Sequence, residues 1–118
     1  MEYQQRNKEL LGTVFATILL AFSASVLADI DADAAKSLAQ HNNCFICHSV
    51  DKKKVGPTFK SVAEKFHGNA NAEARLISHL TVMEKAKFPD GHEEDHMILK
   101  DTDKSEIKNL VDWILSLQ

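Results

Sequence analysis

The chain has 118 residues, of which 44% are apolar and 26% are charged, and it contains two cysteines, one tryptophan and one tyrosine. That length fits a single domain, and the apolar content excludes an intrinsically disordered protein. Two cysteines are too few for a disulfide scaffold. The formal net charge of −3 argues against a nucleic-acid partner, because nucleic-acid binders show an excess of basic residues.

Residues 1–28 have the pattern of an export signal. Arg6 and Lys8 precede an uncharged apolar run over residues 10–27, which ends in small residues just before Asp29. This order is typical of a secretory signal peptide, which is removed after export. The alternative is an uncleaved membrane anchor, because the run is close to the length that spans a bilayer. The sequence therefore predicts a periplasmic domain over residues 29–118, with membrane contact only if the first segment is retained.

The exported part begins with a predicted helix. Asp31 or Asp33 can cap it, and the helix is expected to extend to about Asn43. Its apolar side carries Ala35, Leu38 and Ala39. A domain this small gains little surplus stability from burial alone, so it usually contains a metal, a cofactor or disulfides. We therefore expect such a stabilising group in the residues that follow.

A cofactor-attachment motif comes directly after this helix, where residues 44–48 read Cys-Phe-Ile-Cys-His. The pattern CxxCH is the attachment signature of c-type haem. Two thiols three residues apart at a helix end can reach the two vinyl groups of one porphyrin and form thioethers. The histidine that follows is then placed to bind the iron. Cys44, Cys47 and His48 are thus the predicted haem-binding residues.

Three other uses of the two cysteines fit the sequence less well. A redox dithiol is expected in a strand–helix–strand context, which the sequence lacks. A structural zinc site needs four ligands, and there is no third cysteine. A disulfide across so short a loop would be strained and would stabilise little. The sequence therefore predicts one covalently attached haem c.

The motif and the downstream segment Val55-Gly56-Pro57-Thr58-Phe59-Lys60 resemble a small bacterial class I, or monohaem, cytochrome c. The resemblance covers residues 32–118 in order and spacing, and it implies an all-α cytochrome c fold of four to five helices around one covalently bound haem. It also implies that the carbonyl group of Pro57 accepts a hydrogen bond from the ring of His48, which orients that ligand and raises its basicity. The alternative role of Gly56 and Pro57 is a turn before a helix.

Three further helices are predicted after the motif. The first begins at Thr58 and is stopped by Gly68, the second begins at Asn71 and ends before the turn residues 88–91, and the third begins at Asp103. No stretch alternates with the period of a strand, so the sequence predicts helices alone. The expected inward-facing residues are Phe59, Val62, Ala63 and Phe66, then Leu76, Ile77, Leu80 and Met83, and finally Ile107, Leu110, Val111, Ile114 and Leu117.

The second iron ligand is expected between the turn and the last helix. Met83 continues an apolar helix stripe, which is typical of a core residue. By resemblance, Met97 lies where the family places its ligand, and Trp113 resembles the aromatic residue that packs near the first helix and the haem edge. His96 is an alternative ligand that would give a lower-potential bis-histidine centre, and an open distal site is a third possibility. Otherwise His92 and His96 are expected to be exposed in a polar loop or to form a separate metal site with the acids between them.

Two charged runs flank these predicted ligands. Lys52-Lys53-Lys54 follows the haem motif, and Glu93-Glu94-Asp95 precedes Met97. Each run is either an ordinary solvated face or a surface that steers a redox partner electrostatically, an effect that weakens with salt.

The predicted function is electron transport and not catalysis. We expect an exported monohaem cytochrome that transfers single electrons between redox partner proteins through an iron bound by His48 and Met97. A faint resemblance extends to the haem subunit of an oxidoreductase such as sulfite dehydrogenase. The alternative is a haem enzyme or a gas-binding sensor, which would need an open or exchangeable distal site and, for a peroxidase, acid–base residues above the iron.

Overall fold

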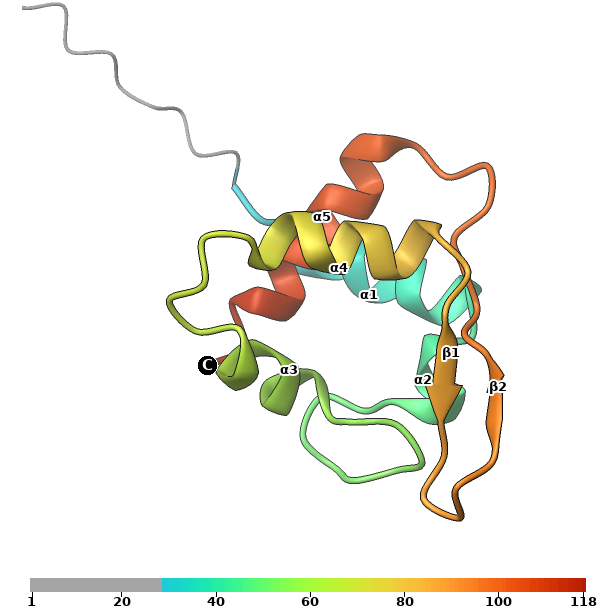
Figure 1. The fold of residues 1–118 in the computed structure, drawn as a ribbon. Helices are drawn as coiled ribbons and strands as arrows, with labels where there is room; N and C mark the ends of the chain where they lie inside the picture. The colour runs from blue at the N-terminus through green and yellow to red at the C-terminus, as the bar shows by residue number, and fades with distance from the viewer. Residues whose placement is uncertain (1–28) are drawn as a thin grey trace, which may run out of the picture.

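The computed structural model describes residues 29–118, and the predicted signal peptide over residues 1–28 lies outside them. The elements follow in the order α1 (Ala32–His41), α2 (Cys44–Cys47), α3 (Phe59–Lys65), α4 (Ala72–Thr81), β1 (Lys85–Lys87), β2 (Glu93–Asp95) and α5 (Lys104–Leu115), as Figure 1 shows. The described part is therefore mostly helical, which confirms the predicted fold class. Within it, no helix combines the length and the apolar character needed to cross a bilayer.

Three helices begin at capping residues that the sequence indicated. The side chains of Asp31, Thr58 and Asp103 each accept a hydrogen bond from a first-turn amide, at 2.9, 3.0 and 2.7 Å. These bonds satisfy amide groups that have no partner within the helix. The end of the first helix differs from the prediction, because α1 stops at His41 and Asn43 adopts a φ of +58°. That left-handed residue separates α1 from the single turn α2.

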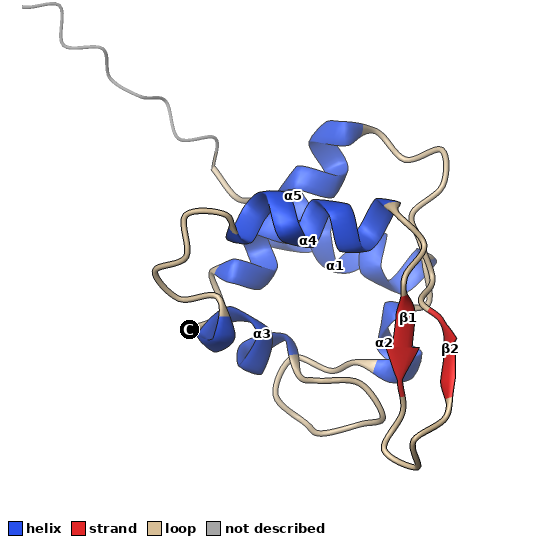
Figure 2. Cartoon of the chain, viewed as in Figure 1, coloured by secondary structure: helices blue, strands red, loops and turns tan. Residues whose placement is uncertain are grey.

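Helix α5 forms the centre of the core and packs against α1, α3 and α4 (Figure 2). Its apolar stripe is buried, and Trp113 in that stripe is only 4% exposed. The ring of Trp113 meets the ring of Phe59 edge-on, with ring centroids 5.7 Å apart. Ala35 and Ala39 of α1 are fully buried, and such small residues let α1 lie close to α5. Trp113 thus belongs to the same buried core cluster as Ala35 and Ala39.

Helix α4 is shorter than predicted. It ends at Thr81, and Val82 already has extended backbone angles. Met83 lies beyond the helix and is 56% exposed, so the prediction that Met83 packs in the core was wrong. Two β-branched residues in succession, Thr81 and Val82, are poorly suited to a helix, and the chain continues instead into a strand.

A short antiparallel hairpin occupies the segment in which the sequence predicted only a helix end and a loop. Lys85 lies opposite Asp95, and Lys87 lies opposite Glu93, so the predicted turn over residues 88–91 connects two strands (red in Figure 2). The strands read Lys-Ala-Lys and Glu-Glu-Asp. Opposite charges that face each other across strands stabilise such pairs. Strands this rich in charge lack the alternation of apolar and polar residues by which a strand is predicted from sequence. The expectation of helices alone was therefore wrong here.

Candidate haem site

Helix α2 is a single turn that carries both cysteines. Cys44 is its first residue and Cys47 its last, and residues three apart lie on the same side of a helix. Both are free thiols of intermediate burial. Burial raises the pKa of the Cys44 thiol above its ordinary value, and the neighbouring Cys47 adds to that shift. The turn therefore presents two thiols side by side, as covalent attachment of one flat group requires.

The ring of His48 is fixed in orientation directly after this turn. Its Nδ1 donates a hydrogen bond of 2.7 Å to the carbonyl oxygen of Pro57, and its ring stacks on Phe59 with centroids 5.3 Å apart. Gly56 packs against the same ring, because a Cβ atom there would lie 2.7 Å from Cε1 of His48 and 2.8 Å from the carbonyl oxygen of Cys47. Since Nδ1 carries the proton, Nε2 is free to bind a metal.

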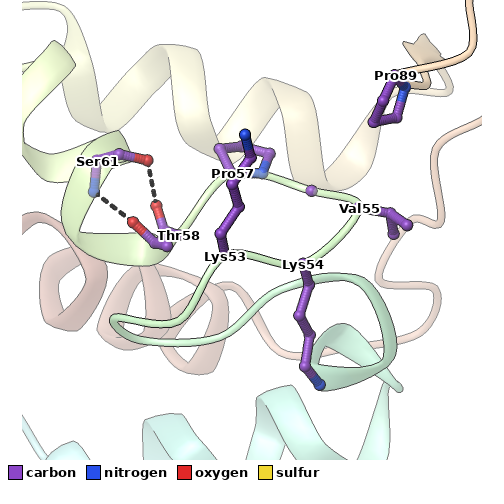
Figure 3. A pocket seen from close by; sticks show the side chains of 8 residues that line it. Lys53, Lys54, Val55, Pro57, Thr58, Ser61 and Pro89 are labelled. Atoms are coloured by element: carbon purple, nitrogen blue, oxygen red, sulfur yellow. Dashed lines mark hydrogen bonds between the residues drawn. The ribbon is translucent and has the colours of Figure 1, made fainter.

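The loop between α2 and α3 forms a basic surface beside this histidine. Nζ of Lys54 donates to the carbonyl oxygen of Phe45, which ties the loop back to α2. Lys53 and Lys54 line a cavity of about 300 Å³. Figure 3 shows Thr58 at one side of this cavity and Pro89, from the hairpin turn, at the opposite side. The complete lining consists of Lys53, Lys54, Val55, Gly56, Pro57, Thr58, Ser61 and Pro89.

The hairpin brings His96 towards His48. The centroids of the two rings are 6.2 Å apart, and their planes are inclined by 55°. The backbone N–H of His96 donates to the carbonyl oxygen of Glu84 at 2.7 Å, which extends the strand pairing by one residue. Nδ1 of His96 is buried and has no hydrogen-bond partner, and among residues 29–118 it is the one such side-chain atom. Leaving a buried polar atom unpaired costs about 1–3 kcal/mol, which marks it as a candidate ligand atom.

A cluster formed by Arg75 and His79 of α4 and by Glu84 lies against His96. The ring of His79 lies 4.1 Å from the ring of His96, and Nδ1 of His79 donates to Oε2 of Glu84 at 2.9 Å. Arg75 donates to both carboxylate oxygens of Glu84, at 3.0 and 3.1 Å. The hydrogen bond from His79, followed by that from Arg75, holds the pKa of Glu84 below its ordinary value. Burial, and then the neighbouring His79, lowers the pKa of His96.

This cluster was not predicted from the sequence. The one sequence signal was the spacing of Arg75 and His79, which are four residues apart on one helix and therefore share a face. Their common partner, Glu84, lies beyond the helix end, and only the folded hairpin brings it back to them.

The other candidates from the sequence on this side are exposed. Met97 is 60% exposed, and its role as a ligand stays a prediction. His92 is exposed, as expected, and bonds to Asp90 and Glu94. The same expectation was wrong for His96, which is half-buried. In the described part of the chain, no group of three or more His, Cys, Asp or Glu side chains is arranged to hold a metal ion.

The residues at this site fit a covalently attached haem. Two thiols lie one helical turn apart, an oriented histidine follows them, and a second, half-buried imidazole faces that histidine. Thiols that form thioethers and imidazoles that bind iron are the groups by which proteins hold haem c. Gly56 also lacks the side chain that would collide with the ring of His48.

Comparison with known proteins identifies the family. Residues 32–118 match the family model for cytochrome c, and the chain therefore belongs to the cytochrome c family. It is 35% identical over 104 residues to cytochrome c-551 of Allochromatium vinosum, covering 83% of this chain and 100% of that protein. It is 33% identical over 108 residues to cytochrome c-552 of Nitrosomonas europaea, covering 92% of this chain and 95% of that protein.

Two solved structures agree with this assignment. The class 1 cytochrome MtoD from Sideroxydans lithotrophicus ES-1 shares 63% sequence identity and a TM-score of 0.74, covering 75% of this chain and 98% of that one. Wild-type cytochrome c552 of Nitrosomonas europaea shares 29% identity and a TM-score of 0.57, covering 70% of this chain and 99% of that one.

The family fixes the general chemistry of the chain. Its members carry electrons and bind one covalently attached haem c, so this chain is a haem- and iron-binding protein of electron transport. The predicted family and the predicted cofactor are both confirmed.

Proposed function

We propose that the chain is an exported carrier that passes single electrons between redox partner proteins in the periplasm. Cys44 and Cys47 attach the haem, and His48 binds the iron on the proximal side. One observation carries the proposal: the 2.7 Å hydrogen bond from His48 to Pro57 leaves Nε2 of that ring free, directly after a turn that presents two thiols. The bound haem supplies an iron that cycles between Fe(III) and Fe(II).

The surroundings of His48 suit a carrier. An electron carrier works best when its iron ligands keep their positions as the charge on the iron changes. The ring of His48 is bonded to Pro57, stacked on Phe59 and packed against Gly56. The carbonyl oxygen of Pro57 also accepts the hydrogen bond from the ring N–H, which raises the basicity of the ligand. These contacts hold the ring in place in both oxidation states.

The distal ligand comes from one of two neighbouring residues, His96 and Met97. With either bound, the iron has no position left for a substrate or a gas. This separates the carrier from a haem enzyme or a gas sensor, which would keep the distal position open or exchangeable. By resemblance to the family, Met97 is the expected ligand and His96 is the alternative.

The location and partners follow from charge and from the first segment of the sequence. Residues 1–28 have the pattern of a signal peptide, which supports export. Lys52 and Lys53 are exposed beside the haem motif, where positive charge would attract an acidic redox partner. The sequence resemblance to a haem subunit, as in a sulfite dehydrogenase, leads to a different expectation: the chain would then be isolated together with a larger catalytic chain.

Expression of the full chain in a bacterium that matures c-type cytochromes tests the proposal. We expect a periplasmic protein that is isolated without a larger catalytic chain. Its haem should resist acid–acetone extraction and should be reversibly reduced and oxidised. Mutating both cysteines, Cys44→Ala and Cys47→Ala, should abolish covalent attachment, whereas either single change should only weaken it. A high-spin protein that binds cyanide or carbon monoxide immediately would contradict the carrier function.

A further inference from the structure

We propose that Lys54 fixes a positive charge at the haem-attachment turn and thereby raises the reduction potential of the bound haem. The inference rests on the proposed function, because it takes covalent attachment at Cys44 and Cys47 as given. It separates Lys54 from its two neighbours in the basic run, which the sequence treats as equivalent. Three features of the described residues support it.

The way in which the loop holds α2 is the first feature. A helix of one turn is unstable by itself, because its few hydrogen bonds do not offset the ordering of its backbone. The loop between α2 and α3 supplies further bonds: the backbone N–H of Gly56 donates to the carbonyl oxygen of Cys47 at 2.8 Å, and Nζ of Lys54 donates to that of Phe45. Lysine side chains commonly bind the last carbonyl groups of a helix in this way. Lys54 therefore fastens the loop to the turn that carries both cysteines.

The contrast between neighbouring lysines is the second feature. Lys52, Lys53 and Lys54 are all exposed. Within residues 29–118, however, Lys54 is the member of this run whose ammonium group makes a hydrogen bond. A charge on an untethered side chain moves through many positions in the solvent, whereas a charge bound to a carbonyl oxygen stays in one place. Because the interaction between charges weakens with distance and with screening, the held charge of Lys54 should influence the haem most.

The position of the accepting residue is the third feature. Phe45 lies between the two cysteines of the motif, and its ring contacts the ring of Phe59 with centroids 5.9 Å apart. Phe59 in turn stacks on the ring of His48. The carbonyl oxygen that binds Lys54 therefore belongs to a packed part of the attachment site, so the charge is held at a defined place in both oxidation states of the iron.

The direction of the effect follows from the charge on the iron. Reduction of Fe(III) to Fe(II) takes up one electron and removes one positive charge from the haem. A positive charge nearby therefore repels the oxidised form more than the reduced form. The ammonium group of Lys54 favours Fe(II), and its removal should lower the reduction potential.

A redox titration of the haem-loaded protein, followed by its absorption, tests the inference directly. We expect Lys54→Gln to lower the reduction potential. Lys53→Gln, which removes the same charge one residue away, should lower it several-fold less. Lys54→Arg keeps the charge and a donor for the same carbonyl group, so it should restore the original potential. Added salt should reduce the difference between the unaltered protein and Lys54→Gln, because ions screen an exposed charge.

Hydrogen exchange at the backbone amide of Gly56 supplies a readout that does not involve electron transfer. This amide bonds to Cys47 within the loop that Lys54 fastens. Its exchange should be faster in Lys54→Gln and unchanged in Lys53→Gln and in Lys54→Arg. Should Lys54→Gln fail to mature, Lys54→Ala and Lys53→Ala provide the same comparison, because shortening an exposed side chain leaves no cavity in the core.

The two proposals fail in different ways. Equal shifts of the potential in Lys54→Gln and Lys53→Gln would overturn the role of Lys54, and so would a lowered potential in Lys54→Arg or an unchanged exchange rate at Gly56 in Lys54→Gln. Each of these results would come from a protein that still holds its haem covalently and cycles between oxidation states, so the carrier function would stand. Haem that remains covalently bound after both cysteines are replaced would overturn the proposed attachment site instead.

Discussion

The ring of His79 lies against the ring of His96, with centroids 4.1 Å apart and planes inclined by 42°. His79 belongs to α4, whereas His96 follows the second strand of the hairpin. The contact therefore joins the helical body to the segment that carries both distal candidates. Glu84 strengthens this junction, because it binds His79 through its side chain and His96 through its backbone.

Glu84→Gln should loosen the distal side without unfolding the protein. The change keeps the shape of the side chain but removes the charge that pairs with Arg75 and His79. We expect the oxidised protein to bind added cyanide several-fold faster, since the distal ligand is displaced more readily when its support is weaker. Stopped-flow absorption measures that rate. Glu64→Gln, which removes an exposed carboxylate from α3, is the matched control. An equal rate increase in both variants would contradict the expectation that Glu84 holds the distal segment in place.

Gly56→Ala should disturb the proximal side. The added Cβ would lie 2.7 Å from the His48 ring and 2.8 Å from the carbonyl oxygen of Cys47, and overpacking of this kind typically costs about 1–3 kcal/mol of the free energy of unfolding. Denaturant unfolding of the haem-loaded protein measures the loss, and the Soret band should shift with the ring. Gly68→Ala is the control: its φ of +70° with open space around it predicts a loss of stability with no change in the haem spectrum.

Asp103 should make the stability of α5 depend on pH in the acid range. Hydrogen bonds from the side chain and the backbone of Ser105 hold the pKa of Asp103 below its ordinary value. A carboxyl group whose pKa is lowered by folding stabilises the protein above its unfolded pKa of about 3.9, and that contribution is lost as the pH falls through the folded pKa. Asn caps a helix about as well but does not titrate. Denaturant midpoints measured from about pH 6 to about pH 2, a range that brackets the unfolded pKa, should fall more steeply for the unaltered protein than for Asp103→Asn. Parallel curves for the two proteins would refute this.

The exposed lysines beside the haem motif should affect electron transfer with charged reagents. In a double variant, Lys52→Gln with Lys53→Gln, oxidation of the reduced protein by anionic ferricyanide should be slower, and oxidation by a cationic cobalt complex should be faster. Both differences should shrink as salt is added, because screening weakens the attraction. Replacing Lys100 and Lys104 by Gln, two exposed residues near the start of α5, is the charge-matched control. An equal effect in both pairs would show that only net charge matters.

The proximal half of the site could be predicted because its residues are close together in the sequence. Residues 44–48 form one motif, and Pro57 follows within a short loop, so local spacing is enough to bring them together. The starts of α1, α3 and α5 were predictable for a similar reason, since capping depends on a side chain and the amides two or three residues away.

The distal half could not be predicted in the same way. Whether His96 or Met97 faces His48 depends on the register of the hairpin, and a shift of one residue exchanges the two faces of a strand. The charged strands carry no apolar alternation from which that register can be read. The same hairpin also explains the exposure of Met83, because the backbone leaves α4 before that residue in order to pair.

The isolation of the hairpin has a consequence for how the protein moves. Within residues 29–118, the two strands pair with each other, and no helix packs against them; Glu84 and His96 at their ends provide the link to α4. Segments with so few packing partners open at a free-energy cost well below that of global unfolding. The hairpin amides should therefore exchange hydrogen sooner than those of α5. A distal ligand supplied by residues 96–97 would then do more than complete the coordination of the iron: it would set how often this segment separates from the helical body.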